Sequence, residues 1–308
     1  MSPVDAAAII ARLVQFTAAA VLGGGAMFFL YGVTPDARAS WPSRLITAAS
    51  GAGAIGTLGW LMAQSAQLGD GPADAFNAAN IWSVAADTGF GRVALARLGL
   101  FLLAFLLAMR QRRGRRLWIV LGVLGAAVSA SFAWTGHAVR DEGLLGVIHS
   151  VADVLHLLAA STWIGTLVVL AVLAIVAGRP GAATGASRDL LTGLVRFSAI
   201  GVSVVGILVA SGLVNSWLLV GPKGVGRVLT TPYGQLLLAK LALFGIMLGL
   251  AAANRYRHTP QLERALGTDG GANSIAPVIR SILTETALAI LVLALVSWLG
   301  TLSPPIDG

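Results

Sequence analysis

Three of the four histidines in the chain lie in one largely apolar stretch, residues 134–163, together with a carboxylate placed between two of them. These residues are His137, His149, Asp153 and His156. Imidazole nitrogens bind copper, zinc, iron and nickel, and His and Asp side chains in membranes also relay protons. The chain contains no cysteine, which excludes a thiolate metal site and any disulfide.

The spacing of these residues predicts one polar helix face. Each helical residue advances the direction of the side chain by about 100°, so Asp153 lies roughly 40° from His149, and His156 lies roughly 20° to the other side. Asp153 can therefore contact either histidine. The two histidines are ~10 Å apart along the axis, whereas metal–nitrogen bonds are about 2 Å long. We therefore expect two neighbouring binding positions, or one site with a supporting histidine, and His137 could join His149.

The composition indicates an integral membrane protein. Hydrophobic residues make up 56% of the 308 residues and charged residues 11%, and the mean hydropathy is +0.83. Soluble domains contain about 25% charged residues. The long, continuous apolar runs exclude a transmembrane barrel, whose strands alternate with period two. The formal net charge is +8, but the basic residues cluster in short loops between apolar runs, so we expect no nucleic-acid partner.

The apolar runs predict an all-α bundle of eight transmembrane helices, forming one polytopic membrane domain over residues 1–308. A spanning helix needs about 20 apolar residues. The expected helices are 6–33, 41–67, 88–109, 117–137, 144–177, 190–220, 233–254 and 275–302. Polar connections are expected between them, including an acidic loop at 68–87 and the longest connection at 255–273.

The loop charges predict the orientation. Five arginines lie between Arg110 and Arg116, and most other loop cations fall in the same alternate set of loops. By the positive-inside rule this set is cytoplasmic, so both termini face the outer, periplasmic side. The histidines would then lie in the outer half of the membrane. Met62 falls at the same depth in the second helix and is a further candidate ligand.

Other uses of the same polar residues stay open. The face bearing His149, Asp153 and His156 could be a structural hydrogen-bond network or a proton relay. His137 and His149 could instead ligate a haem between facing helices, as in a transmembrane electron-transfer protein. The interior cations also need partners, which the sequence does not assign; these are Arg12, Arg92, Arg97, Arg196 and Lys240.

Several stretches resemble the copper resistance protein D (CopD) family of bacterial inner-membrane proteins. They are SASFAWTGHA, HSVADVLHLLAASTWIGTL and ASGLVNSW, then LTTPYGQLLLAKLALFGIMLGLAAANRYRHTP, with TGFGRVALARLGL also similar. The resemblance covers most of the chain, with 132–260 as its core. It implies an eight-helix fold, a role in copper homeostasis, and a periplasmic copper-binding partner of the CopC type. His137, His149 and His156 match histidines of the family pattern.

These observations together predict a copper-transporting membrane protein that is not an enzyme. Copper, in either oxidation state, would enter from the periplasm through His137, His149, Asp153 and His156, with Met62 as a further ligand. Uptake fits an outward-facing site better than efflux. A haem protein is the alternative, and a structural partner without a substrate is a third.

Overall fold

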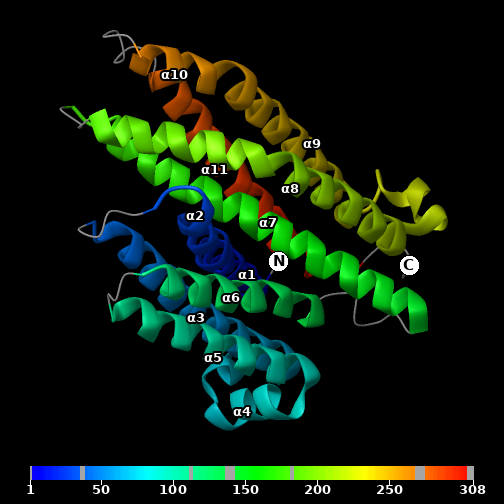
Figure 1. Cartoon of the computed structure of the whole chain (residues 1–308). Coiled ribbons are helices and arrows are strands. Elements are labelled where there is room, and N and C mark those ends of the chain that lie inside the picture. Colours follow the sequence, from blue (N-terminus) through cyan, green and yellow to red (C-terminus); the bar gives the residue numbers. More distant parts are fainter. Residues whose placement is uncertain are drawn as a thin grey trace.

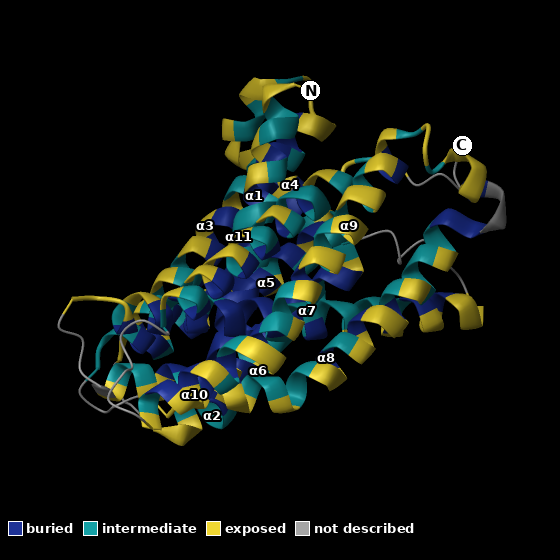
Figure 2. Ribbon diagram, turned by 90° about the horizontal axis from the view of Figure 1, so that it is seen from above, coloured by how far each residue is buried: buried dark blue, intermediate teal, exposed yellow. Residues whose placement is uncertain are grey.

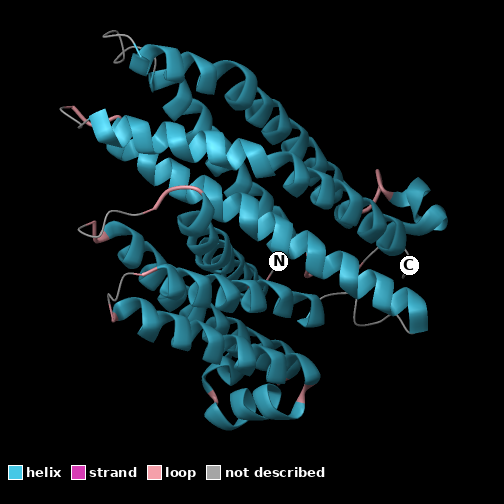
Figure 3. Cartoon of the chain, viewed as in Figure 1, coloured by secondary structure: helices cyan, strands magenta, loops and turns pink. Residues whose placement is uncertain are grey.

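The structure is a computed structural model that describes residues 2–34, 39–110, 114–135, 143–180, 184–267 and 275–303. Every regular element in these residues is helical (Figure 3). Eight helical segments are long and apolar enough to cross a membrane, which confirms the expected number. The spans run Pro3–Tyr31, Trp41–Leu68, Gly89–Met109, Arg115–Thr135, Gly143–Ala177, Gly185–Gly221, Pro232–Gly267 and Ile275–Leu299.

Several spans contain more than one helical element. The helices are α1 (Pro3–Ala20), α2 (Ala26–Tyr31), α3 (Trp41–Leu68), α4 (Ala78–Asp87), α5 (Gly89–Met109), α6 (Arg115–Ser131), α7 (Gly143–Ala177), α8 (Thr184–Gly224), α9 (Pro232–Ala253), α10 (Thr259–Gly267) and α11 (Ile275–Leu299). Two π-helical turns, η1 (Val21–Gly25) and η6 (Asn254–His258), continue α1 and α9. Short 3-10 turns are η2 (Pro72–Phe76), η3 (Phe132–Thr135) and η5 (Val225–Arg227).

Helix α1 lies at the centre of the bundle. It packs against α3 and α6 on one side and against α7 and α11 on the other. Figure 1 shows α3, α4 and α5 on one side of the molecule and α8, α9, α10 and α11 on the opposite side. The start of α1 and the end of α11 lie together, because Gly300 approaches the guanidinium of Arg12. We call this the terminal end of the bundle.

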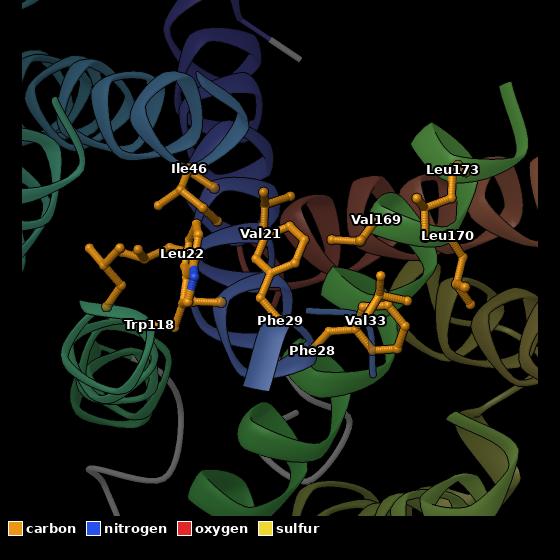
Figure 4. Close-up of a cluster of buried hydrophobic side chains, with 14 of the residues drawn as sticks. Val21, Leu22, Phe28, Phe29, Val33, Ile46, Trp118, Val169, Leu170 and Leu173 are labelled. Atoms are coloured by element: carbon orange, nitrogen blue, oxygen red, sulfur yellow. The ribbon is translucent and has the colours of Figure 1, made fainter. Parts of the chain in front are cut away.

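Glycines allow α1 to pack closely against α7. A Cβ atom at Gly24, in the π-helical turn η1, would overlap the backbone carbonyl oxygen of Ser161, and one at Gly165 would overlap that of Ala20. Only a residue without a side chain permits this approach of two backbones. A buried apolar cluster surrounds the contact, including Leu22, Phe28 and Val169 (Figure 4). The contact between these two segments is therefore one of backbone against backbone.

A buried arginine ties the N-terminal helices together. The side chain of Arg97 on α5 is 1% exposed. Its Nη1 donates to Gln15 Oε1 on α1 at 3.0 Å, and its Nε donates to Ser131 Oγ on α6 at 2.9 Å. Nη2 donates to the Ser131 carbonyl oxygen at 3.2 Å and to Thr135 Oγ1 at 3.1 Å. The guanidinium also lies 3.8 Å from the ring centre of Phe132. All of these partners are neutral. The sequence alone did not assign any partner to this buried cation.

Helices α8 and α9 each pack mainly against one other helix. Helix α8 packs mainly against α7, and α9 packs mainly against α11, whereas α8 and α9 hardly contact each other within the described residues. Buried residues concentrate in the middle of the bundle, and the outer faces are exposed (Figure 2). In a membrane those apolar outer faces would contact lipid.

Two helices were not expected from the hydropathy pattern. The acidic connection 68–87 contains α4, which Asn77 caps by accepting from the backbone N–H groups of Ala79 and Asn80. The expected connection 255–273 contains α10, which continues the seventh span to Gly267 and whose Leu262 and Ala265 are buried. Both segments are too short and too polar to span a membrane, so a prediction based on apolar runs assigns them to loops.

Candidate metal site

The polar face predicted on α7 is present, and it meets polar side chains of α8 and α9. His149 is buried, at 3% exposure, whereas Asp153 and His156 are half-buried. All three lie in the half of α7 nearer its start. Helix α8 adds Ser211 and Asn215, which face His156 and Asp153. The site is therefore built from one half of the bundle, by the helices that cross next to α7.

A hydrogen bond fixes which nitrogen of His156 is free to bind a metal. Nδ1 of His156 lies 3.1 Å from Ser211 Oγ. The Ser211 hydroxyl donates its proton to the carbonyl oxygen of Ile207, one turn earlier on α8. With the hydroxyl proton used in this way, its oxygen accepts from Nδ1–H of the neutral His156 ring, and Nε2 then carries the lone pair. This arrangement is typical of histidines that bind metals, whose second ring nitrogen donates to a protein acceptor.

Asp153 is held from the side by Asn215. Asn215 Nδ2 donates to Asp153 Oδ1 at 3.4 Å. The other atom of the same amide, Asn215 Oδ1, is buried and has no hydrogen-bond partner among the described residues. A buried acceptor without a partner is costly. A cation bound beside Asp153 would satisfy this oxygen, so the donor set fits a positively charged substrate.

A lysine places a positive charge next to this carboxylate. Lys240 on α9 is half-buried. Its charge acts on Asp153 and on His156, and Asp153 is also within electrostatic reach of His149. Lys240, to which the sequence assigned no partner, therefore lies within electrostatic reach of Asp153. A metal ion entering this cluster would compete with the ammonium group for Asp153.

The structure does not bring all the candidate ligands together. His137 lies outside the described residues, so its contribution to a metal site or to a haem stays a prediction. Met62 is on α3, which packs against α1 and α5 rather than among the helices that hold the cluster. Among the described residues, no group of three or more His, Cys, Asp and Glu side chains is arranged to hold a metal ion.

Sequence reasoning did not identify Ser211 or the partner of Lys240. A serine in an apolar helix carries no sequence signal of its own, because most such hydroxyls bond to their own helix. Asn215 and Lys240 were visible as polar residues within apolar runs, but the pairing of helices is not encoded in hydropathy.

Comparison with known proteins places the chain in a family. Two family models match, described as the copper resistance protein D-like N-terminal domain over residues 2–147 and copper resistance protein D over residues 193–299. No solved structure matches the chain significantly.

Three relatives in bacteria are similar along much of the chain. Copper resistance protein D of Pseudomonas syringae pv. tomato is 41% identical over 192 residues, which cover 62% of this chain and 60% of that protein. Inner membrane protein YebZ of Escherichia coli K12 is 31% identical over 298 residues, covering 95% of this chain and 97% of that protein. Copper transport protein CutJ of Bacillus subtilis 168 is 28% identical over 250 residues, covering 78% of this chain and 44% of that protein. The chain is a multi-pass membrane protein, and it belongs to the copper resistance protein D family.

Proposed function

We propose that this protein moves copper ions across the bacterial inner membrane, with the polar cluster on α7, α8 and α9 as the binding site. Two relatives carry names that refer to copper resistance and copper transport, and a third is named an inner membrane protein. The single observation that carries the proposal is the line of His149, Asp153 and His156 on one helix face, with the unpartnered oxygen of Asn215 beside it. This is a set of nitrogen and oxygen donors within the bilayer.

Copper occupies two positions along α7 in this scheme. The first is at His149, nearer the terminal end, where His137 could add a second imidazole. The second is deeper, at Nε2 of His156. Asp153 lies between them and contributes negative charge to both. A copper ion can therefore pass from one imidazole to the other while it stays close to the Asp153 carboxylate. Because each position has few protein ligands, the ion is bound weakly enough to move on.

Lys240 acts as the counter-charge of the empty site. Without copper, its ammonium group offsets the negative charge of Asp153. Copper displaces the ammonium group, and release of copper allows it to return. The exchange avoids leaving a lone carboxylate in a medium where charges are expensive. It also limits copper affinity, which transport requires.

The direction of transport follows from the proposed orientation. Most described arginines in loops lie at the end opposite the terminal end, so the positive-inside rule places that end in the cytoplasm. The cluster is then in the periplasmic half, which favours uptake. A periplasmic protein of the CopC type would deliver copper there. The scheme assigns the protein no catalytic step, so we propose a permease and not an enzyme.

Metal content and the visible spectrum of the purified protein test this proposal. We would compare the wild type, a His149→Ala/His156→Ala variant and a His258→Ala variant after equilibration with copper. His258 is a matched control because it is the fourth histidine and lies in η6, away from the cluster. We expect copper in the wild type and in His258→Ala, and its loss from the double variant. Copper retained by a folded double variant would disprove the site. A haem absorption band that is present in the wild type and absent from the double variant would instead indicate an electron-transfer protein.

A further inference from the structure

A cavity lies beyond the polar cluster, on the same face of α7. It has a volume of about 230 Å³. Trp163, Leu167 and Leu170 of α7 form one wall, and they continue the line of His149, Asp153 and His156 at helical spacing. Residues of α8, α9, η6 and α11 complete the lining. From His156 to Trp163 is ~10 Å along the helix axis, so this cavity is separate from the metal site.

The lining is mostly apolar, but it also includes polar residues such as Ser198, Arg255 and Tyr256, and it contains a buried carboxylate, Glu285, and a buried amide, Asn254. Glu285 on α11 is 2% exposed. Its Oε1 accepts from Trp163 Nε1 at 3.0 Å, and its Oε2 accepts from Asn254 Nδ2 at 3.1 Å. Asn254 is also buried, and its Oδ1 has no hydrogen-bond partner among the described residues. Asn254, which lines the cavity, therefore carries an unsatisfied acceptor next to a carboxylate.

The backbone geometry places this amide at the cavity. Asn254 begins the π-helical turn η6, where α9 departs from regular α-helix. Such single π turns are frequent at functional sites, because they redirect side chains that a regular helix would point elsewhere. Arg255 in the same turn also lines the cavity, and its Nη1 donates to the carbonyl oxygen of Ser198 on α8 at 2.7 Å. This bond joins η6 to α8 beside the cavity.

The cavity opens between α8 and α9 towards the region that lipid would occupy. Its lining includes Val202 of α8, which is 62% exposed, and Tyr256 of η6, which is 74% exposed. Because α8 and α9 hardly contact each other, a molecule dissolved in the bilayer can enter without crossing the protein core. The occupant thus comes from the membrane.

Size and polarity narrow the class of occupant. A dry apolar cavity of about 150 Å³ holds benzene, so this larger space suits a substituted six-membered ring. Water needs two to four polar partners at each position, and the apolar lining does not supply them throughout. An occupant must also donate a hydrogen bond to Asn254 Oδ1. A ring bearing a hydroxyl group meets both conditions.

We propose that this cavity binds a membrane-soluble phenol or hydroquinone, with its ring between Trp163 and α8 and its hydroxyl group donating to Asn254 Oδ1. Any apolar tail would leave between α8 and α9 into the bilayer. The proposal does not depend on copper transport, because it uses other residues and a different part of the bundle.

Binding of tetramethylhydroquinone to copper-free protein in lipid nanodiscs, without oxygen, tests the proposal. Gly201 lines the cavity, and a side chain added there meets no atom within 4 Å, so Gly201→Leu fills the space without displacing the backbone. Gly206 is a matched control, because it lies on the same helix, is equally open and does not line the cavity. Asn254→Leu removes the acceptor. Thermal unfolding confirms that each variant is folded.

We expect saturable binding to the wild type and to Gly206→Leu, and at least tenfold weaker binding to Gly201→Leu. Asn254→Leu should weaken binding by about tenfold, the value of one hydrogen bond. Tetramethylbenzoquinone, which has the same shape and no hydroxyl group, should bind more weakly than the hydroquinone. Equal binding to wild type and Gly201→Leu would overturn the site. Equal affinity for the quinone would overturn the role of Asn254. Tighter binding of decanol than of the hydroquinone would overturn the proposed ring and identify the occupant as a lipid chain.

Discussion

Replacing Ser211 with alanine tests whether a single hydroxyl group sets the metal affinity of His156. The substitution removes the acceptor of the 3.1 Å contact with Nδ1 and leaves the imidazole in place. Without it the ring can rotate and can exchange protons between its two nitrogens. Nε2 would then carry a lone pair, and so be able to bind copper, for only part of the time.

The expected size of the effect follows from two values. One hydrogen bond between transmembrane helices is worth about 0.6 kcal/mol on average, so the fold should lose less than about 1 kcal/mol. Loss of the hydrogen-bond partner of a metal-binding histidine lowers metal affinity by about 10–100-fold. We therefore expect about tenfold weaker copper binding with almost unchanged stability.

Competition with a chromophoric copper chelator in nanodiscs measures this affinity. Ser203→Ala is the matched control, because Ser203 lies on the same helix and is exposed. An affinity within twofold of the wild type in a folded Ser211→Ala protein would refute the assignment of Nε2 of His156 as a ligand.

Four further predictions follow from contacts described above. Lys240→Met should raise copper affinity by at least tenfold and slow copper release, because the ammonium group no longer repels the metal cation or competes with it for Asp153; a chelator competition and a proteoliposome flux assay measure the two effects. Arg97→Met should destabilise the protein by about 2–3 kcal/mol, from four hydrogen bonds at about 0.6 kcal/mol each, whereas the exposed Arg92→Met on the same helix should change the unfolding free energy little. Gly165→Val should lower that free energy by about 3 kcal/mol or more, and Gly99→Ala, at a position with open space, should not. Copper affinity should fall as pH decreases through the range in which histidines take up protons, because protons and copper compete for imidazole nitrogen; equal affinity at pH 8 and pH 5 would argue against histidine ligands.

The spanning helices were predictable because a bilayer imposes a length and an apolar composition on each of them. Helix α4 was not, because Asn77 and a short amphipathic pattern determine it, and neither feature requires a membrane. Helix α10 was missed for the same reason. Its polar sequence resembles a loop, and only the burial of Leu262 shows that it packs.

The candidate site was predictable within one helix and not between helices. The angular positions of His149, Asp153 and His156 follow from helix geometry alone. Which helix faces them does not, because lipid is as apolar as leucine and hydropathy carries no information on helix neighbours. The contact of Ser211 with His156 and the electrostatic interaction of Lys240 with Asp153 therefore emerge only from the three-dimensional arrangement.

The glycine contact between α1 and α7 also bears on motion. Where two backbones touch through Gly24 and Gly165, neither helix can slide or rotate against the other without a collision. These two helices form a rigid spine for the whole molecule. Helix α8 packs along α7 and extends this spine, whereas α9, which carries Lys240, packs mainly against α11. A hinge-like swing of α9 would change access to the polar cluster while the histidines stay fixed on the spine.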